Sequence, residues 1–176
     1  MKKLSLLLFS VFFIAFCKNK SGSIEDQLYS CMLSSLSERE KEALMPIISD
    51  FEEHLIMNEI LESSSAESYW NLYNKMAETE VYDFSNEFGF SKKIRFLEKA
   101  DPTDNQQLID CHERIFQSDK YLQSKHHKLK TEMQALRGNR ITPVIIAKTT
   151  IKYFTVEDFE LDYNRFNTLL FIENFK

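Results

Sequence analysis

The 176-residue chain has few of the residues that make tight turns, with only three glycines and three prolines. Glycine supplies the left-handed backbone conformation and proline presets turn geometry, so their scarcity favours long helices over hairpins. The chain also lacks an apolar run of about 20 residues, which a membrane-spanning helix requires. Apolar residues are nevertheless abundant, since 43% of the chain is hydrophobic, with 15 phenylalanines and 7 tyrosines. This content excludes a disordered chain and is enough for the core of one domain.

Sequence motifs that carry catalysis are missing as well. The chain contains no glycine-rich phosphate loop, no G-x-S-x-G elbow and no H-E-x-x-H zinc helix. It also lacks the Glu-x-x-His pairs that hold metals in di-iron helical bundles. His126 and His127 are neighbours, so on a helix they point about 100° apart and cannot grip one ion together. Cys111 and His112 are equally poorly placed for proton transfer. We therefore predict a non-enzymatic protein without a cofactor or a metal.

The N-terminus has the organisation of a secretory signal peptide. Lys2 and Lys3 precede an apolar run over residues 4–16, which has the length of a signal core. The run ends at Cys17 and resembles the signal peptide of a bacterial lipoprotein, although Phe16 stands where that pattern has Gly, Ala or Ser. The resemblance implies cleavage before Cys17 and acylation of this cysteine.

This resemblance divides the chain into three parts. They are a signal peptide at residues 1–16, a lipidated Cys17 with a polar tether at 17–23, and a helical domain at 24–176. The lipid would anchor the domain to a bacterial membrane, on the periplasmic or surface face of the cell envelope. An ordinary secreted protein and an uncleaved anchor are the alternatives, and both also keep the domain outside the cytoplasm.

Two cysteines remain after Cys17, and each falls on the apolar stripe of a predicted helix. Cys31 follows Leu28 by three residues, and Cys111 lies between Leu108 and Ile115. Disulfides persist outside the cytoplasm, so we predict a bridge between Cys31 and Cys111. Closing a loop of about 80 residues would stabilise the fold by roughly 4 kcal/mol. The alternative is two buried free thiols that pack as small hydrophobes.

Aliphatic residues recur at a seven-residue spacing in one stretch of the chain. They are Leu108, Ile115, Leu122, Leu129 and Leu136. The spacing keeps them on one side of a helix and predicts a single long helix over about 104–137. Capping signals and helical apolar spacing predict the remaining helices. These are expected at 24–36, from 38 toward 61, from about 65, at 92–99, from 143 and from 156. Only the aromatic spacing over 81–90 fits neither a helix nor a strand throughout. We predict an all-α domain of six or seven helices packed around the long one.

The formal charge of −5 becomes −7 once Lys2 and Lys3 leave with the signal peptide. This acidic balance argues against nucleic acid as a partner. One basic strip interrupts it, and is formed by Lys120, Lys125, His126, His127, Lys128, Lys130, Arg137 and Arg140. The strip is a candidate for binding anionic lipid headgroups, an acidic protein partner or the acidic face of a second copy. A solvated helix flank is the remaining interpretation.

Two functional hypotheses of different classes follow. The first is a lipid-anchored cell-envelope protein that acts through protein–protein contacts, in an assembly, adaptor or inhibitor role, with another envelope protein as its partner. The second is a helical carrier of an apolar small ligand in a cavity between helices, lined by aromatic and methionine side chains. The methionines concerned are Met32, Met45, Met57, Met76 and Met133. We favour the first because it accounts for both the anchor and the basic strip.

Overall fold

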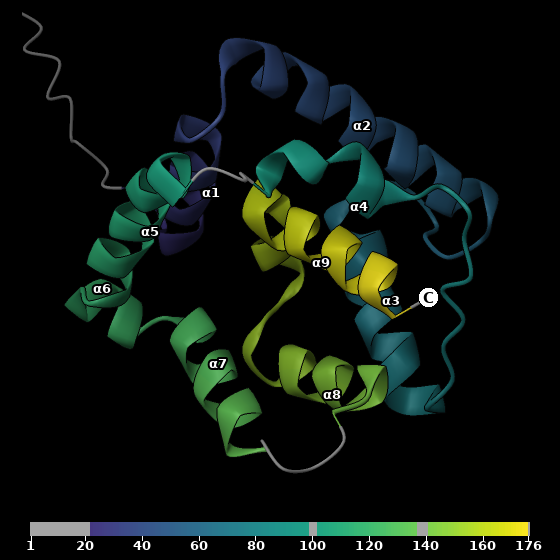
Figure 1. Ribbon diagram of the computed structural model, residues 1–176. Coiled ribbons are helices and arrows are strands. Elements are labelled where there is room, and N and C mark those ends of the chain that lie inside the picture. Colours follow the sequence, from purple (N-terminus) through teal and green to yellow (C-terminus); the bar gives the residue numbers. More distant parts are fainter. Residues whose placement is uncertain (1–21, 99–101, 137–140, 176) are drawn as a thin grey trace, which may run out of the picture.

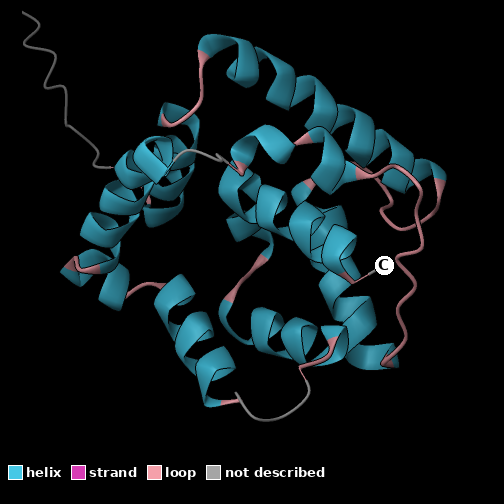
Figure 2. Ribbon diagram, viewed as in Figure 1, coloured by secondary structure: helices cyan, strands magenta, loops and turns pink. Residues whose placement is uncertain are grey.

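The computed structural model describes residues 22–98, 102–136 and 141–175. Within these ranges the chain forms nine α-helices, two short 3₁₀ helices and no strand, so the predicted all-α fold is confirmed (Figure 1, Figure 2). The helices are α1 (Ile24–Ser34), α2 (Glu38–Met57), α3 (Ala66–Thr79), α4 (Phe90–Lys93), η1 (Arg95–Leu97), α5 (Pro102–Phe116), α6 (Asp119–Leu122), α7 (Lys125–Ala135), α8 (Pro143–Tyr153), η2 (Val156–Glu160) and α9 (Asp162–Asn174). The predicted signal peptide at 1–16, Cys17, Arg137 and Arg140 lie outside the described residues.

The single long helix predicted over residues 104–137 is wrong. This segment folds as α5, α6 and α7, which follow one another down one side of the molecule (Figure 1). Serines begin the second and third of these helices. The side-chain oxygen of Ser118 accepts a hydrogen bond from the amide of Tyr121, and that of Ser124 accepts one from the amide of His127. Each serine satisfies a free amide at a new helix start, so local capping overrides the seven-residue period.

The residues of that period consequently lie in different environments. Ile115 is 6% exposed, whereas Leu122 is 47% exposed. The helix around which the fold is organised is α9, in which seven of the 13 residues are buried. It contacts α1, α3, α4 and η2, and therefore joins the two halves of the molecule.

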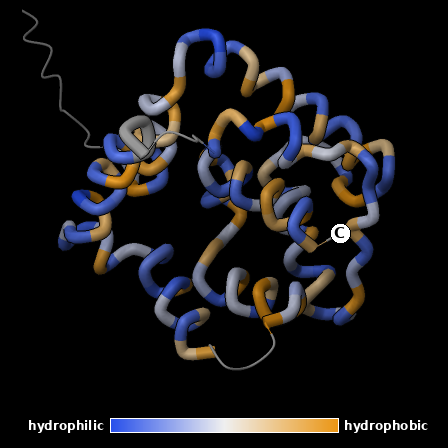
Figure 3. Tube along the Cα trace, viewed as in Figure 1, coloured by the Kyte–Doolittle hydropathy of each residue, from blue (hydrophilic) through white to orange (hydrophobic). Residues whose placement is uncertain are grey.

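The main core lies between α2, α3, α4, α8 and α9 and is rich in aromatic rings. Phe51 of α2 is fully buried and stacks on Phe88 and Phe90, with ring centroids 5.0 and 4.5 Å apart. Burial also raises the pKa of Tyr73, in α3, to about 12. In Figure 3 apolar positions recur along α2 between hydrophilic ones, as expected for a helix with one buried face. The helix continues through the exposed Pro46.

A second, smaller core lies between α1, α5 and α6, and we call it the satellite core. Its buried residues are Ile24, Leu28, Cys31, Ile115 and Tyr121. Helix α1 packs against α5 on one side and α9 on the other, so it connects the satellite core with the main core.

Candidate functional site

The predicted basic strip is divided between two helices. Lys120 belongs to α6, whereas the residues from Lys125 to Lys130 belong to α7. Arg137 and Arg140 lie outside the described residues. No residue of α7 is buried. Its packing is limited to partly buried residues such as Leu129, so polar contacts to α8, η2 and α1 also hold α7 in place.

Lys125 is directed back into the molecule. Its Nζ lies 2.6 and 2.9 Å from the two carboxylate oxygens of Asp158. The same carboxylate accepts the amide hydrogen of Thr155 at 2.6 Å, at the start of η2. Lys125 therefore links α7 to η2, and its charge is already paired within the protein.

His126 is also turned inward, toward α1. Its Nε2 lies 3.3 Å from Oε1 of Glu25, which is within ion-pair distance. The geometry is too oblique for a hydrogen bond, and Nε2 is buried without a hydrogen-bond partner. The imidazole ring meets Phe154 and Tyr163 edge to face, with centroids 5.0 and 5.3 Å apart. His126 thus lies in the seam between the main core and the satellite core.

Two opposing effects set the ionisation of Glu25. Burial of this carboxyl group raises its pKa, whereas its contact with His126 and its own backbone amide lower it, to a net value of about 2. Because Glu25 lies in the first turn of α1, the helix dipole also favours the carboxylate. The carboxylate of Glu25 and the imidazole of His126 form a largely buried polar pair.

The remaining cations of the strip are exposed. Lys130 places its Nζ 4.7 Å from the centroid of the Phe116 ring, in a cation–π contact. Lys120 donates a hydrogen bond to the carbonyl of Gly22. Lys128 has no ion-pair partner among the residues that the structure describes. Among the described residues, Lys128 and Lys130 are therefore the lysines of α7 that no carboxylate pairs with.

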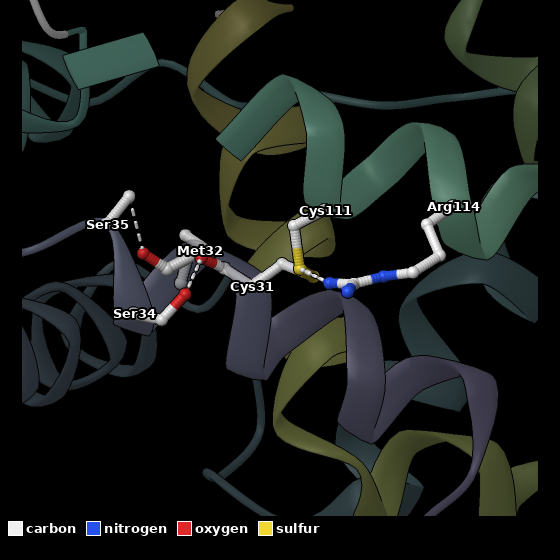
Figure 4. The surroundings of a disulfide bond; sticks show 6 residues. All are labelled: Cys31, Met32, Ser34, Ser35, Cys111 and Arg114. Atoms are coloured by element: carbon white, nitrogen blue, oxygen red, sulfur yellow. Dashed lines mark hydrogen bonds between the residues drawn. A yellow bond between two sulfur atoms is a disulfide. The ribbon is translucent and has the colours of Figure 1, made fainter. Parts of the chain in front are cut away.

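The predicted bridge between Cys31 and Cys111 is confirmed. The two Cα atoms are 5.9 Å apart, and the bridge joins α1 to α5 inside the satellite core. Cys31 is buried and Cys111 half-buried. Figure 4 shows the guanidinium of Arg114 beside the bridge, with a nitrogen donating to the sulfur of Cys111 at 3.6 Å. A shallow hollow of about 480 Å³ lies next to Cys111.

The other candidate site residues from the sequence, which are the histidines and the methionines, do not gather at one place in the structure. His127 packs its ring against Tyr121, and His112 packs against Phe116. Within the described ranges no group of three His, Cys, Asp or Glu side chains is arranged to hold a metal. The five methionines considered for a carrier cavity are scattered as well, because Met76 is buried in the main core while Met45 and Met57 are exposed on α2.

The sequence interpretation missed a groove beside α3. It has a volume of about 930 Å³ and is lined by α3, by residues 58–62 and by residues 81–85. Four carboxylates and one ammonium group line it, from Glu59, Glu62, Glu78, Asp83 and Lys75. The groove depends on how residues 80–88 return past α3, and no capping or periodic signal in the sequence predicts that path.

No family model, no curated protein and no solved structure matches this chain. Among the described helices, none combines the length and the apolar content needed to cross a membrane.

Proposed function

We propose that this chain is a lipid-anchored cell-envelope protein without enzymatic activity, whose helical domain acts through protein–protein contacts in an assembly, adaptor or inhibitor role. The signal peptide and Cys17 would provide the anchor, and a second envelope protein would be the partner. The bridge between Cys31 and Cys111 supports this compartment, because structural disulfides are typical of proteins outside the cytoplasm.

The observation that carries the proposal is the surface of α7. This helix has no buried residue, and its inward cations, Lys125 and His126, are used to attach it to η2 and α1. Lys128 and Lys130 are exposed on it in a protein that is acidic as a whole. Opposite charges across an interface steer association and fix orientation, so an acidic partner suits this surface.

Crosslinking of membranes from the native host tests the α7 surface. The double charge reversal Lys128→Glu with Lys130→Glu should reduce the yield of the crosslinked partner by about tenfold. The matched control reverses two exposed cations elsewhere, Lys92→Glu with Arg95→Glu, and should retain the parent yield. Equal yields from all three proteins would contradict the proposal. So would a variant that retains the partner and loses only its affinity for anionic vesicles.

Mass spectrometry without reduction tests the anchor and the compartment. The protein isolated from host membranes should begin at an acylated Cys17 and yield a crosslinked peptide containing Cys31 and Cys111. An intact Met1 together with three free thiols would place the domain in the cytoplasm and refute the compartment.

A further inference from the structure

Residues 81–88 form a non-helical segment that connects α3 to Gly89 along the outside of the molecule (Figure 1). From residue 83 to residue 88 the exposure alternates with a period of two, which is the period of a β-strand. Asp83, Ser85 and Glu87 are exposed, whereas Phe84 is buried and Asn86 and Phe88 are half-buried. Val81 and Tyr82, which precede the alternation, are both exposed, and the ring of Tyr82 contacts that of Phe84, with centroids 5.6 Å apart.

Aromatic anchors hold this segment in place. Phe84 is 3% exposed and meets the ring of Phe171 edge to face, with centroids 5.5 Å apart. Phe88 stacks on Phe51 in the main core. Because its middle and its C-terminal end are fixed to the core, a ligand that pairs with the segment would have little of it to order first.

The backbone of the segment is nevertheless unpaired. Within the described part of the chain, no amide or carbonyl of residues 82–87 takes part in a backbone–backbone hydrogen bond. The amide of Ser85 donates to the carboxylate of Asp83, and the carbonyl of Phe84 accepts from the side chain of Asn86. The other amides in this range make no hydrogen bond to any residue that the structure describes. A strand-like segment with free backbone groups is a template for a second strand.

The acidic groove lies directly beside this template. Residues 81–85 form one of its walls, and the flank of α3 with residues 58–62 forms the rest. Its four carboxylates outnumber its one ammonium group, Lys75, so the groove favours cationic ligands. The groove also has exposed apolar side chains in its lining, since Val81 and Tyr82 are 71% and 42% exposed.

We propose that this groove binds an extended polypeptide segment bearing lysine or arginine, which adds as a strand along residues 82–87. Backbone pairing would supply affinity, and alternate side chains of the ligand would reach the carboxylates of Glu62, Glu78 and Asp83. This inference rests on the proposed function, since it assigns the chemistry of a protein partner to a second surface. The groove and α7 carry opposite charge. The acidic groove should repel anionic lipids, whereas the basic surface of α7 should attract them.

Synthetic peptides and the full chain provide the test. The probe is a peptide of alternating lysine and valine, with a glutamate–valine peptide as the charge control. A second pair of peptides carries the cationic sequence N-methylated at every second residue, in each of the two registers. Binding is measured by titration calorimetry, and the amides of residues 82–87 are followed by hydrogen exchange in NMR spectra.

The cationic peptide should bind saturably and slow the exchange of amides within 82–87, whereas the glutamate–valine peptide should not bind. N-methylation in one register should abolish binding, because it removes the donors facing the segment. The variant Glu62→Lys with Glu78→Lys should bind about tenfold more weakly than the parent. The matched control, Glu42→Lys with Glu53→Lys on the exposed side of α2, should bind as the parent does.

Equal binding of both N-methylated peptides would overturn backbone pairing, and unchanged binding by the groove variant would overturn the site. If no peptide binds while the reversals at Lys128 and Lys130 still release the crosslinked partner, this inference fails and the proposed function stands. If the peptide binds as expected while those reversals release nothing, the groove is supported and the α7 surface is refuted.

Discussion

Among the residues that the structure describes, the main core contains twenty buried ones, whereas the satellite core contains five. Ordering each residue costs about 1 to 2 kcal/mol of backbone entropy, and burial returns only about 25 cal/mol per Å² of apolar surface. The satellite core, with five buried and four partly buried residues, offsets less of this cost than the main core does. The satellite core is also the part of the molecule that holds the disulfide, and its seam with α7 holds the pair of Glu25 and His126. In the satellite core, where little apolar surface is buried, the disulfide and the pair of Glu25 and His126 therefore supply part of the stabilisation.

Substitutions of matched core positions should separate the two regions most strongly. Leu44→Ala removes a fully buried leucine side chain from the main core and should lower the free energy of unfolding by up to about 5 kcal/mol. Leu28→Ala, at a position 1% exposed in the satellite core, should cost about 2 kcal/mol. Urea denaturation followed by circular dichroism measures both losses. Equal losses would mean that the two cores contribute alike.

Removal of the bridge should have the next largest effect. The double variant Cys31→Ser with Cys111→Ser releases a loop of 80 residues and should lower stability by about 4 kcal/mol. Hydrogen exchange should then accelerate in α1 and α5, while α2 and α3 keep their protection, because the main core does not depend on the bridge. Uniform acceleration through all four helices would show that the two cores unfold as one unit.

The sequence predicted the features that depend on neighbouring residues. Ser23, Ser37 and Thr142 cap α1, α2 and α8 as their spacing indicated. The pairing of Cys31 with Cys111 could be predicted because both cysteines lie on apolar stripes and residues 24–176 contain no other cysteine.

Features that depend on distant partners could not be predicted. Lys125 and His126 looked like outward members of a basic strip, but their carboxylate partners lie in η2 and α1. The path of residues 81–88 depends on contacts of Phe84 with Phe171 and of Phe88 with Phe51, which lie far away in the sequence.

The polar pair in the seam should make stability sensitive to acid. The pKa of Glu25 is about 2 in the folded protein, below its ordinary value of 4.5, so the unfolded chain binds more protons between these pH values. The stabilisation is complete above pH 4.5 and is lost as the pH falls toward 2, by about 2 to 3 kcal/mol. Thermal melts from pH 6 to 2 should show a shallower decline for Glu25→Gln than for the parent. Parallel declines would mean that the pair of Glu25 and His126 does not contribute to the acid sensitivity of the fold.

The smallest effect is expected where α7 meets η2. Lys125 is 43% exposed, so solvent screens its ion pair with Asp158, and Lys125→Met should cost less than about 1 kcal/mol. Asp158→Asn should cost more, because this carboxylate also accepts the amide hydrogen of Thr155 at the start of η2. A double-mutant cycle over the two positions isolates the ion pair. A coupling above 2 kcal/mol would mean that α7 is fastened mainly at η2, and the seam at Glu25 and His126 would then be the secondary attachment.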